Sequence, residues 1–375
     1  MNIRYLLRTR YALVIISISV FIASIICFYI FLTQLHSDQL PKITKSTANR
    51  YPYNDCVGIR AIAFSPDSKI LVTGNDCGII RAWNAETGAG VQCLPAHSAT
   101  VTGLLFDKSG LCISSGGDGE IKAWNILTGT KAFSLKGKAG VSAIANTSDN
   151  SLLAAGSYRL ITLWDVKTHK IAKSIEEASD LPLVYPPDTP MALAFSPDST
   201  LIASGGQCGS ITVFEISTKK VKFSFPGVGQ ERICSLAFSP DGKYLVSTNN
   251  YGDVTVRAAS SGDLVANLKS GEGSGNSFVS FCKNKNCISA GSSAGKISFW
   301  KAPEILSKRD LSPPTTNAQG FWSAAVSPDG KYLAAGYGYN ETKIWDVVNG
   351  KLLGKHIGPE RTWNINAEFA IPSSP

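Results

Sequence analysis

The chain has 375 residues, of which 17% are charged and 44% are hydrophobic, and its formal net charge is +8. This composition excludes an intrinsically disordered chain, because disordered chains combine low hydrophobicity with high net charge. Thirty-four glycines indicate many tight turns, and the length permits a large folded core.

A segment near the N-terminus has the length and composition of a membrane-spanning helix. Residues 11–32 contain no charged side chain, and at about 1.5 Å per residue they would span about 33 Å, enough to cross the hydrocarbon core. Arg4, Arg8 and Arg10 precede this segment, whereas the first basic residue after it is Lys42. The positive-inside rule therefore places the N-terminus in the cytoplasm. A cleaved signal peptide is the alternative, but the apolar run is long for one and no small-residue cleavage site follows it.

This topology divides the N-terminal part of the chain into three segments. We expect residues 1–10 to form a cytoplasmic N-terminus, residues 11–32 a transmembrane helix, and residues 33–54, with two prolines and no sustained apolar pattern, a linker. The rest of the chain is then exported. We interpret the protein as a single-pass protein of a bacterial inner membrane with a periplasmic domain. The reverse topology, with a cytosolic domain, is the alternative.

Residues 55–360 contain one pattern repeated seven times. The last copy begins with the turn at residues 327–330, in which proline presets φ, aspartate can bond its own backbone and glycine accepts positive φ. Residues 332–335 then alternate as a short strand, and residues 342–347 form another. By subtraction, one large residue recurs every 40 to 50 residues: Trp83, Trp124, Trp164, Phe214, Arg257, Trp300 and Trp345. Such a period predicts the four-stranded blades of a propeller.

These repeats resemble those of the WD-repeat (WD40) family of β-propellers. The resemblance is carried by seven copies in phase over residues 57–357, with Ser-Pro-Asp turns at residues 65–67, 196–198, 239–241 and 327–329. It implies an all-β, seven-bladed WD40-type propeller around a central channel. Residues 361–375 alternate like a first strand, so this tail is a candidate for one extra strand where the ring closes.

One repeat matches all four residues with which this family ties a blade together. In the second blade they are His97, Ser114, Asp118 and Trp124. The resemblance implies a structural set in which imidazole, carboxylate, hydroxyl and indole hydrogen-bond one another, so that no buried polar group lacks a partner. The alternative is a Ser-His-Asp hydrolase triad built from the same residue types.

Aromatic residues and arginines are expected together on one face. The resemblance implies that the turn containing Asp118 lies on the same face as the start of each first strand, and three other blades carry tyrosine at the Asp118 position. Aromatic residues and arginine anchor protein interfaces. The alternative is that the tyrosines pack against neighbouring blades in place of the missing hydrogen-bonded sets. The predicted partner-binding rim consists of Arg60, Tyr158, Arg159, Tyr251, Trp322 and Tyr339.

Eight of the nine cysteines follow the predicted membrane segment, and an exported domain allows disulfides. Cys282 and Cys287 flank a four-residue turn, so they can face each other across a hairpin. Two further pairs would share the face that carries the rim: Cys56 with Cys77, and Cys208 with Cys234. No Cys-x-x-Cys motif or histidine cluster indicates a metal site, and no cofactor is predicted.

The sequence predicts a non-catalytic, membrane-anchored scaffold that binds one or more proteins, because propellers present many loops on a rigid frame. Four histidines, no nucleophile motif and no convergent carboxylates argue against catalysis. The alternative is a ligand-binding or enzymatic propeller that acts at the mouth of the central channel. Lysines and arginines are scattered along the sequence, so nucleic acid is not a predicted partner.

Overall fold

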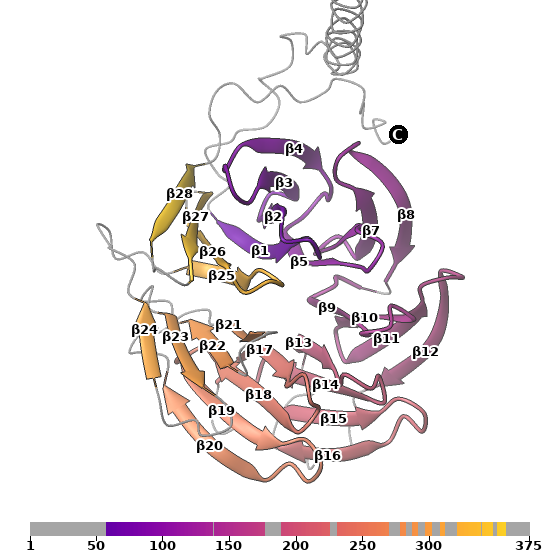
Figure 1. Ribbon diagram of the computed structural model, residues 1–375. Coiled ribbons are helices and arrows are strands. Elements are labelled where there is room, and N and C mark those ends of the chain that lie inside the picture. The colour runs from indigo at the N-terminus through magenta and orange to yellow at the C-terminus, as the bar shows by residue number, and fades with distance from the viewer. Residues whose placement is uncertain are drawn as a thin grey trace, which may run out of the picture. The chain divides into compact units, whose positions relative to one another are not determined.

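Seven antiparallel sheets of four strands each make up the part of the chain that the computed structural model describes. That part comprises residues 58–137, 139–176, 189–225, 231–269, 278–282, 287–291, 297–301, 308–311, 321–338, 340–347 and 351–357. It belongs to one of the two compact units of the chain, Tyr51–Trp363. Within this unit the sheets surround a central axis, and the first strand of each sheet is innermost (Figure 1). The seven-bladed all-β propeller predicted from the repeats is confirmed.

Each blade takes its four strands consecutively from the chain. Blades one to four consist of β1 (Ile59–Phe64), β2 (Ile70–Asn75), β3 (Ile79–Asn84) and β4 (Gly90–Pro95); β5 (Val101–Phe106), β6 (Cys112–Gly116), β7 (Glu120–Asn125) and β8 (Thr130–Lys136); β9 (Ala143–Asn146), β10 (Leu152–Ser157), β11 (Leu160–Asp165) and β12 (Lys170–Glu176); β13 (Pro190–Phe195), β14 (Leu201–Gly206), β15 (Ile211–Glu215) and β16 (Val221–Phe225). Blades five to seven consist of β17 (Ile233–Phe238), β18 (Tyr244–Asn249), β19 (Asp253–Ala258) and β20 (Leu264–Lys269); β21 (Phe278–Cys282), β22 (Cys287–Gly291), β23 (Ile297–Lys301) and β24 (Lys308–Leu311); β25 (Phe321–Val326), β26 (Tyr332–Tyr337), β27 (Glu341–Asp346) and β28 (Leu352–Ile357).

The Ser-Pro-Asp turns join the first and second strands of their blades. In blade one, the Ser65 hydroxyl donates to Asp67 Oδ1 at 2.6 Å, and Asp67 Oδ1 accepts the backbone N–H of Lys69 at 3.1 Å. The hydrogen bond from Ser65 is the main reason that the pKa of Asp67 lies below its usual range. In blade seven, Gly330 has a φ of 73°, the positive value that the turn sequence predicts.

The recurring large residue occupies one register in every blade. It lies in the third strand and faces an aliphatic residue or cysteine of the second strand: Trp83 faces Leu71, Trp124 Cys112, Trp164 Leu153, Phe214 Ile202, Arg257 Leu245, Trp300 Ile288 and Trp345 Leu333. The second strands do not alternate as predicted. All residues of β26 after Tyr332 are buried, because neighbouring blades cover both faces of the strand.

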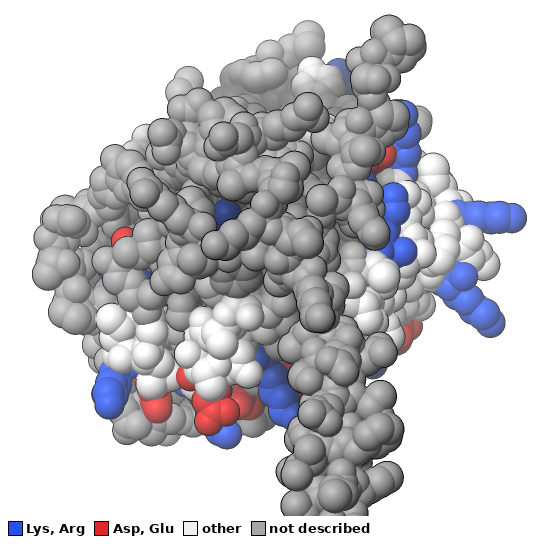
Figure 2. All heavy atoms as spheres, turned by 90° about the horizontal axis from the view of Figure 1, so that it is seen from above, with Lys and Arg blue, Asp and Glu red and all other residues white. Residues whose placement is uncertain are grey.

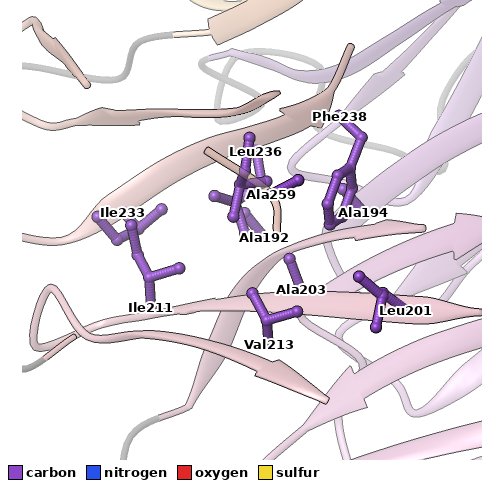
Figure 3. Packing of buried hydrophobic residues seen from close by; sticks show 11 residues of the cluster. Ala192, Ala194, Leu201, Ala203, Ile211, Val213, Ile233, Leu236, Phe238 and Ala259 are labelled. Atoms are coloured by element: carbon purple, nitrogen blue, oxygen red, sulfur yellow. The ribbon is translucent and has the colours of Figure 1, made fainter. Parts of the chain in front are cut away.

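Among the described residues the hydrophobic core consists of seven clusters, and each cluster joins two successive blades. The cluster between blades four and five packs Ile211 and Val213 of β15 against Ile233 and Leu236 of β17 (Figure 3). The cluster that closes the ring packs Trp83 of blade one with residues of β26 and β27 in blade seven. A single blade therefore cannot bury its apolar faces alone, and the ring is the unit of stability.

Close contacts between blades require glycine at the end of some second strands. A Cβ on Gly205, in β14, would lie 2.4 Å from Ile233 Cγ2 of the next blade. A Cβ on Gly336, in β26, would lie 2.4 Å from Ile59 Cγ2 across the closure. The same contact between a glycine and an isoleucine of the next blade therefore occurs at two joints of the ring.

Side chains also cross the closure between blades seven and one. The Asn75 amide donates to Asn340 Oδ1 at 3.3 Å, and the Ser323 hydroxyl donates to the Ile59 carbonyl at 3.1 Å. Gly58 and Gly338 form an isolated antiparallel bridge. The tail at residues 361–375, predicted as a possible closing strand, lies outside the described residues.

The N-terminal segments of the sequence analysis, residues 1–10, 11–32 and 33–54, also lie outside the described residues. Within the described part of the chain, no helix is long and apolar enough to cross a membrane.

Candidate functional site

The predicted hydrogen-bonded set of blade two comes together around β6. His97 precedes β5, Ser114 lies in β6, Trp124 lies in β7, and Asp118 lies in the turn between β6 and β7. His97 Nδ1 is 3.0 Å from Asp118 Oδ1, and His97 Nε2 is 2.8 Å from Ser114 Oγ. Trp124 Nε1 donates to Ser114 Oγ at 3.0 Å. The four side chains thus form one continuous series of hydrogen bonds.

A neutral imidazole satisfies every polar group in this series. Burial lowers the pKa of His97 and outweighs Asp118, whose charge raises it. The neutral ring can donate from Nδ1 to Asp118 and accept at Nε2 from the Ser114 hydroxyl, which in turn accepts from the indole. Burial raises the pKa of Asp118, but backbone hydrogen bonds from Glu120 and Ser98, together with His97, bring it below its usual range.

The hydrolase alternative fails because a substrate has no access to the serine. Ser114 is 0% exposed and His97 is buried. A nucleophilic hydroxyl must reach the carbonyl that it attacks, and here the oxygen is enclosed between blade strands and already accepts the Trp124 indole. The three residues therefore resemble a catalytic triad only in type, and their hydrogen bonds hold the blade together.

Blades one and five use different contacts to hold the residue that corresponds to Trp124. In blade one, Trp83 Nε1 donates to Thr73 Oγ1 at 3.2 Å. In blade five, Arg257 replaces the tryptophan, and its guanidinium stacks over Phe225 of blade four, 3.9 Å from the ring centroid. An Arg257 nitrogen also donates to the Gly262 carbonyl at 3.1 Å. Contacts with the preceding blade thus replace part of the hydrogen-bonded set.

We call the side of the ring where the inner strands begin, and where the second and third strands are joined, the start face. Two predicted rim residues meet there at the ring closure. Trp322 of β25 occupies the space beside Gly58 that a Cβ would need, and the Arg60 guanidinium lies over its ring at 3.7 Å. A carboxylate oxygen of Asp76 lies 4.0 Å from Arg60. Trp322, predicted as a rim residue, therefore packs against its neighbours at the ring closure.

The structure adds a second arginine that the sequence analysis missed. Arg232 directly precedes the inner strand β17 and acts on Arg60 electrostatically. Burial lowers the pKa of Arg60, Asp76 raises it, and the charge of Arg232 lowers it. A basic residue immediately before an inner strand was the available signal, but only the folded ring brings Arg232 of blade five near Arg60 of blade one.

Tyr158 and Tyr251 project from the start face into solvent. They lie in the turns between the second and third strands of blades three and five, and their exposed fractions are 65% and 52%. The packing alternative is wrong for these two residues, because a tyrosine that filled the place of a missing hydrogen-bonded set would be buried. Arg159 follows Tyr158 with a φ of 58° and is half-buried. Tyr339 lies outside the described residues.

Cys77, Cys208 and Cys234, which belong to two of the predicted pairs, lie on the start face. Cys77 is disulfide-bonded, as the predicted pair requires, and Cys56 lies outside the described residues. The predicted pair of Cys208 and Cys234 is wrong, because both residues are thiols. They belong to different blades, and Cys234 Sγ instead donates to the nearby Arg232 carbonyl at 3.6 Å.

The third predicted pair lies in blade six. Cys282 and Cys287 are directly opposite in the antiparallel ladder of β21 and β22, and directly opposite residues have Cα separations compatible with a disulfide. Their side chains lie outside the described residues, so this bridge stays a prediction. In the described part of the chain, no three histidine, cysteine or acidic side chains group as a metal site would need.

A cavity of about 310 Å³ opens at the opposite side of the ring, where the inner strands end. Residues from the ends of inner strands and the turns after them line it in blades one to four, among them Pro66, Phe106, Lys108, Asn146, Phe195 and Pro197. The Asn146 amide donates to the Phe106 carbonyl at 3.4 Å, and the Ser148 hydroxyl donates to the Pro197 carbonyl at 2.7 Å. The channel mouth was a predicted ligand site, but of these residues the sequence singled out only Pro66 and Pro197, as parts of turns, and the lining residues lie far apart in the chain.

Comparison with known proteins identifies the repeats. The family model described as "WD domain, G-beta repeat" matches residues 51–84, 88–125, 129–165 and 313–346. The model described as "Anaphase-promoting complex subunit 4 WD40 domain" matches residues 193–302.

Similar proteins include Telomerase protein component 1 of Mus musculus, which is 25% identical over 305 residues, 79% of this chain and 11% of that protein. Pre-mRNA-processing factor 19 homolog 2 of Arabidopsis thaliana is 25% identical over 163 residues, 42% of this chain and 29% of that protein. Apoptotic protease-activating factor 1 of Mus musculus is 35% identical over 71 residues, 19% of this chain and 6% of that protein. The chain thus spans less than a third of each of these relatives. Matched repeats in both halves of the chain and seven four-stranded blades support a WD40 family for this chain.

Proposed function

We propose that the chain is a non-catalytic scaffold that binds one or more proteins through its start face. The exposure of Tyr158 and Tyr251 carries this proposal. A tyrosine offers a large apolar surface and a polar end at a low cost in side-chain entropy, which suits it to anchor a partner. Arg60 and Arg232 lie near the same face and would favour a partner with acidic or planar polar groups. One similar protein is named "Telomerase protein component 1" and another "p21-activated protein kinase-interacting protein 1-like". Both names agree with a protein that binds other proteins.

Alanine at both exposed tyrosines, Tyr158→Ala with Tyr251→Ala, is expected to abolish partner capture. Truncation of one such anchor costs about 2 kcal/mol or more, which corresponds to about 30-fold weaker binding. The melting temperature should stay nearly unchanged, because both side chains are mostly solvated. The measurement is crosslinking and pull-down of the full chain from native membranes, followed by thermal unfolding of the purified variant.

Two matched variants separate binding from folding. Leu353→Ala removes a side chain that is 42% exposed on β28, away from the turns of the start face, and should leave capture intact. Trp322→Ala should lower the melting temperature, because that ring packs at the closure. Capture that persists in the double tyrosine variant would contradict the proposal. A small ligand in the cavity at the opposite side of the ring would then be the better candidate for what the propeller binds.

The second part of the proposal is that residues 11–32 anchor the chain in a membrane, with residues 1–10 in the cytoplasm and the propeller outside it, in a bacterial periplasm. The uncharged run and the three arginines that precede it support this topology. An epitope added after Pro375 should resist alkaline extraction from membranes and should be removed when protease is added to cells whose outer envelope is opened. An epitope that protease reaches only after lysis of the inner membrane would favour the reverse topology.

A further inference from the structure

Lysines that are scattered in the sequence gather on the outer edge of blades two, three and four. They belong to the hairpins that join the third strand of each blade to its outermost strand, residues 125–133, 165–173 and 215–222, which together we call the lysine belt. The belt contains seven lysines and two carboxylates, a formal charge of +5. The corresponding hairpins of blades one and five, residues 84–92 and 258–266, each carry −1. Basic side chains protrude at the right of Figure 2, the side on which Figure 1 places β8 and β12.

The three hairpins form one continuous surface, because each rests on the outer strand of the preceding blade. The His169 ring at the tip of the blade-three hairpin stacks on Phe133 of β8, with ring centroids 4.1 Å apart. Lys173 Nζ of β12 donates to the Ile216 carbonyl in the blade-four hairpin at 2.7 Å. The belt is therefore a contiguous band rather than three separate hairpins.

Most of the charge on the belt is exposed and takes part in no close ion pair. Lys131, Lys167, Lys170, Lys219, Lys220 and Lys222 are all exposed, and no ion pair joins them to a carboxylate of the described residues. The two belt carboxylates take part in local bonds. Asp165 Oδ1 accepts the Thr168 backbone N–H at 2.7 Å, and Glu215 Oε2 accepts the Thr218 hydroxyl at 3.0 Å.

Each belt hairpin also exposes one large aliphatic side chain. Leu127 is 72% exposed, Ile171 is 55% exposed and Val221 is 49% exposed. Solvated lysines beside exposed aliphatic groups match the boundary between lipid headgroups and acyl chains, where basic residues meet anionic lipids and apolar side chains enter the bilayer.

We propose that the lysine belt rests on the anionic headgroups of a lipid bilayer, an inference that depends on the proposed membrane anchor. The belt fits other partners less well. Lysine is depleted at the centres of protein interfaces. The belt contains no arginine and no exposed phenylalanine, tyrosine or tryptophan of the kind that reads bases or stacks on them, and its exposed imidazole, His169, stacks on Phe133. Residues 33–54 cannot extend further than about 75 Å at about 3.4 Å per residue, so an anchored propeller always stays near the bilayer.

Lysine footprinting of the full chain in nanodiscs tests this proposal. Discs of phosphatidylcholine alone are compared with discs in which a third of the lipid is phosphatidylglycerol, and acylation of each lysine by a water-soluble reagent is followed by mass spectrometry. In the anionic discs we expect the belt lysines to react about threefold more slowly, and high salt to remove the difference. Lys243 and Lys331, whose side chains are 73% and 69% exposed outside the belt, should react equally in both discs.

A variant that removes most of the belt charge is compared with a control variant outside the belt. Lys167→Gln, Lys170→Gln, Lys219→Gln and Lys222→Gln together should abolish the protection of Lys131 and Lys220, whereas Lys243→Gln with Lys331→Gln should preserve it. Equal reactivity of the belt in both discs would overturn the proposal, as would protection that nuclease treatment removes.

Failure of the anchor is a separate result. If the chain leaves both kinds of disc in an alkaline wash, the anchor proposal is wrong. Flotation with vesicles of the same two compositions then tests whether the belt binds anionic lipid without the anchor. Flotation with the anionic vesicles but not with the neutral ones would still support the belt proposal. Flotation with neither kind of vesicle would overturn it.

Discussion

Alanine in place of Gly205 is expected to destabilise the propeller by about 1 to 3 kcal/mol, the usual cost of an added group in a well-packed core. The new Cβ would lie 2.4 Å from Ile233 Cγ2 and 2.9 Å from Ile233 Cβ, so the joint between blades four and five must open. Alanine also restricts the unfolded chain, which favours folding by about 0.4 to 1 kcal/mol, but this gain is smaller than the cost of the clash. Denaturant unfolding of both proteins measures the difference.

A double-mutant cycle identifies the clash as the cause. Ile233→Ala removes the Cγ2 atom that the new Cβ would meet, so the double variant should be more stable than the sum of the single effects predicts, by about 0.5 to 3 kcal/mol. Gly117→Ala is the matched control. Its Cβ would meet no atom closer than 3.5 Å, so this substitution should leave stability unchanged or raise it. Additive effects at Gly205 and Ile233 would show that the contact does not set the spacing of these blades.

Ser114→Ala is expected to cost about 2 to 4 kcal/mol. The substitution removes both the acceptor of the Trp124 indole and the hydroxyl at His97 Nε2, and each buried polar group that loses its partner costs about 1 to 3 kcal/mol. Because Ser114 is 0% exposed, water cannot replace the hydroxyl without opening the blade. The measurement is the free energy of unfolding from denaturant titration.

Thr73→Val in blade one is a comparison substitution for which we expect a smaller loss of stability. Thr73 Oγ1 accepts the Trp83 indole at 3.2 Å, but no histidine belongs to that contact among the described residues. Valine keeps the shape of threonine, so only the hydrogen bonds of the hydroxyl are lost and the cost should be about half that of Ser114→Ala. Equal costs for the two substitutions would mean that the His97 and Asp118 part of the series contributes no stability.

The sequence could predict contacts that lie within one repeat. His97, Ser114, Asp118 and Trp124 lie within 28 consecutive positions, and consecutive strand pairing then determines which side chains meet. The wrong pairing of Cys208 with Cys234 shows the limit of this reasoning. Both residues belong on one face, but they come from different blades, and the position of one blade on the next depends on packing between sheets.

The sequence by itself determined the number of blades, the register of the large third-strand residue and the Ser-Pro-Asp turns, because hydrophobic period and turn chemistry are local properties of the chain. Only the tertiary structure decided which rim residues are free. It packs Trp322 under Arg60 at the closure and leaves Tyr158 and Tyr251 in solvent. It also assembled the cavity from four blades and the lysine belt from three. These surfaces join residues tens of positions apart, and the curvature of the closed ring, which no single repeat encodes, brings them side by side.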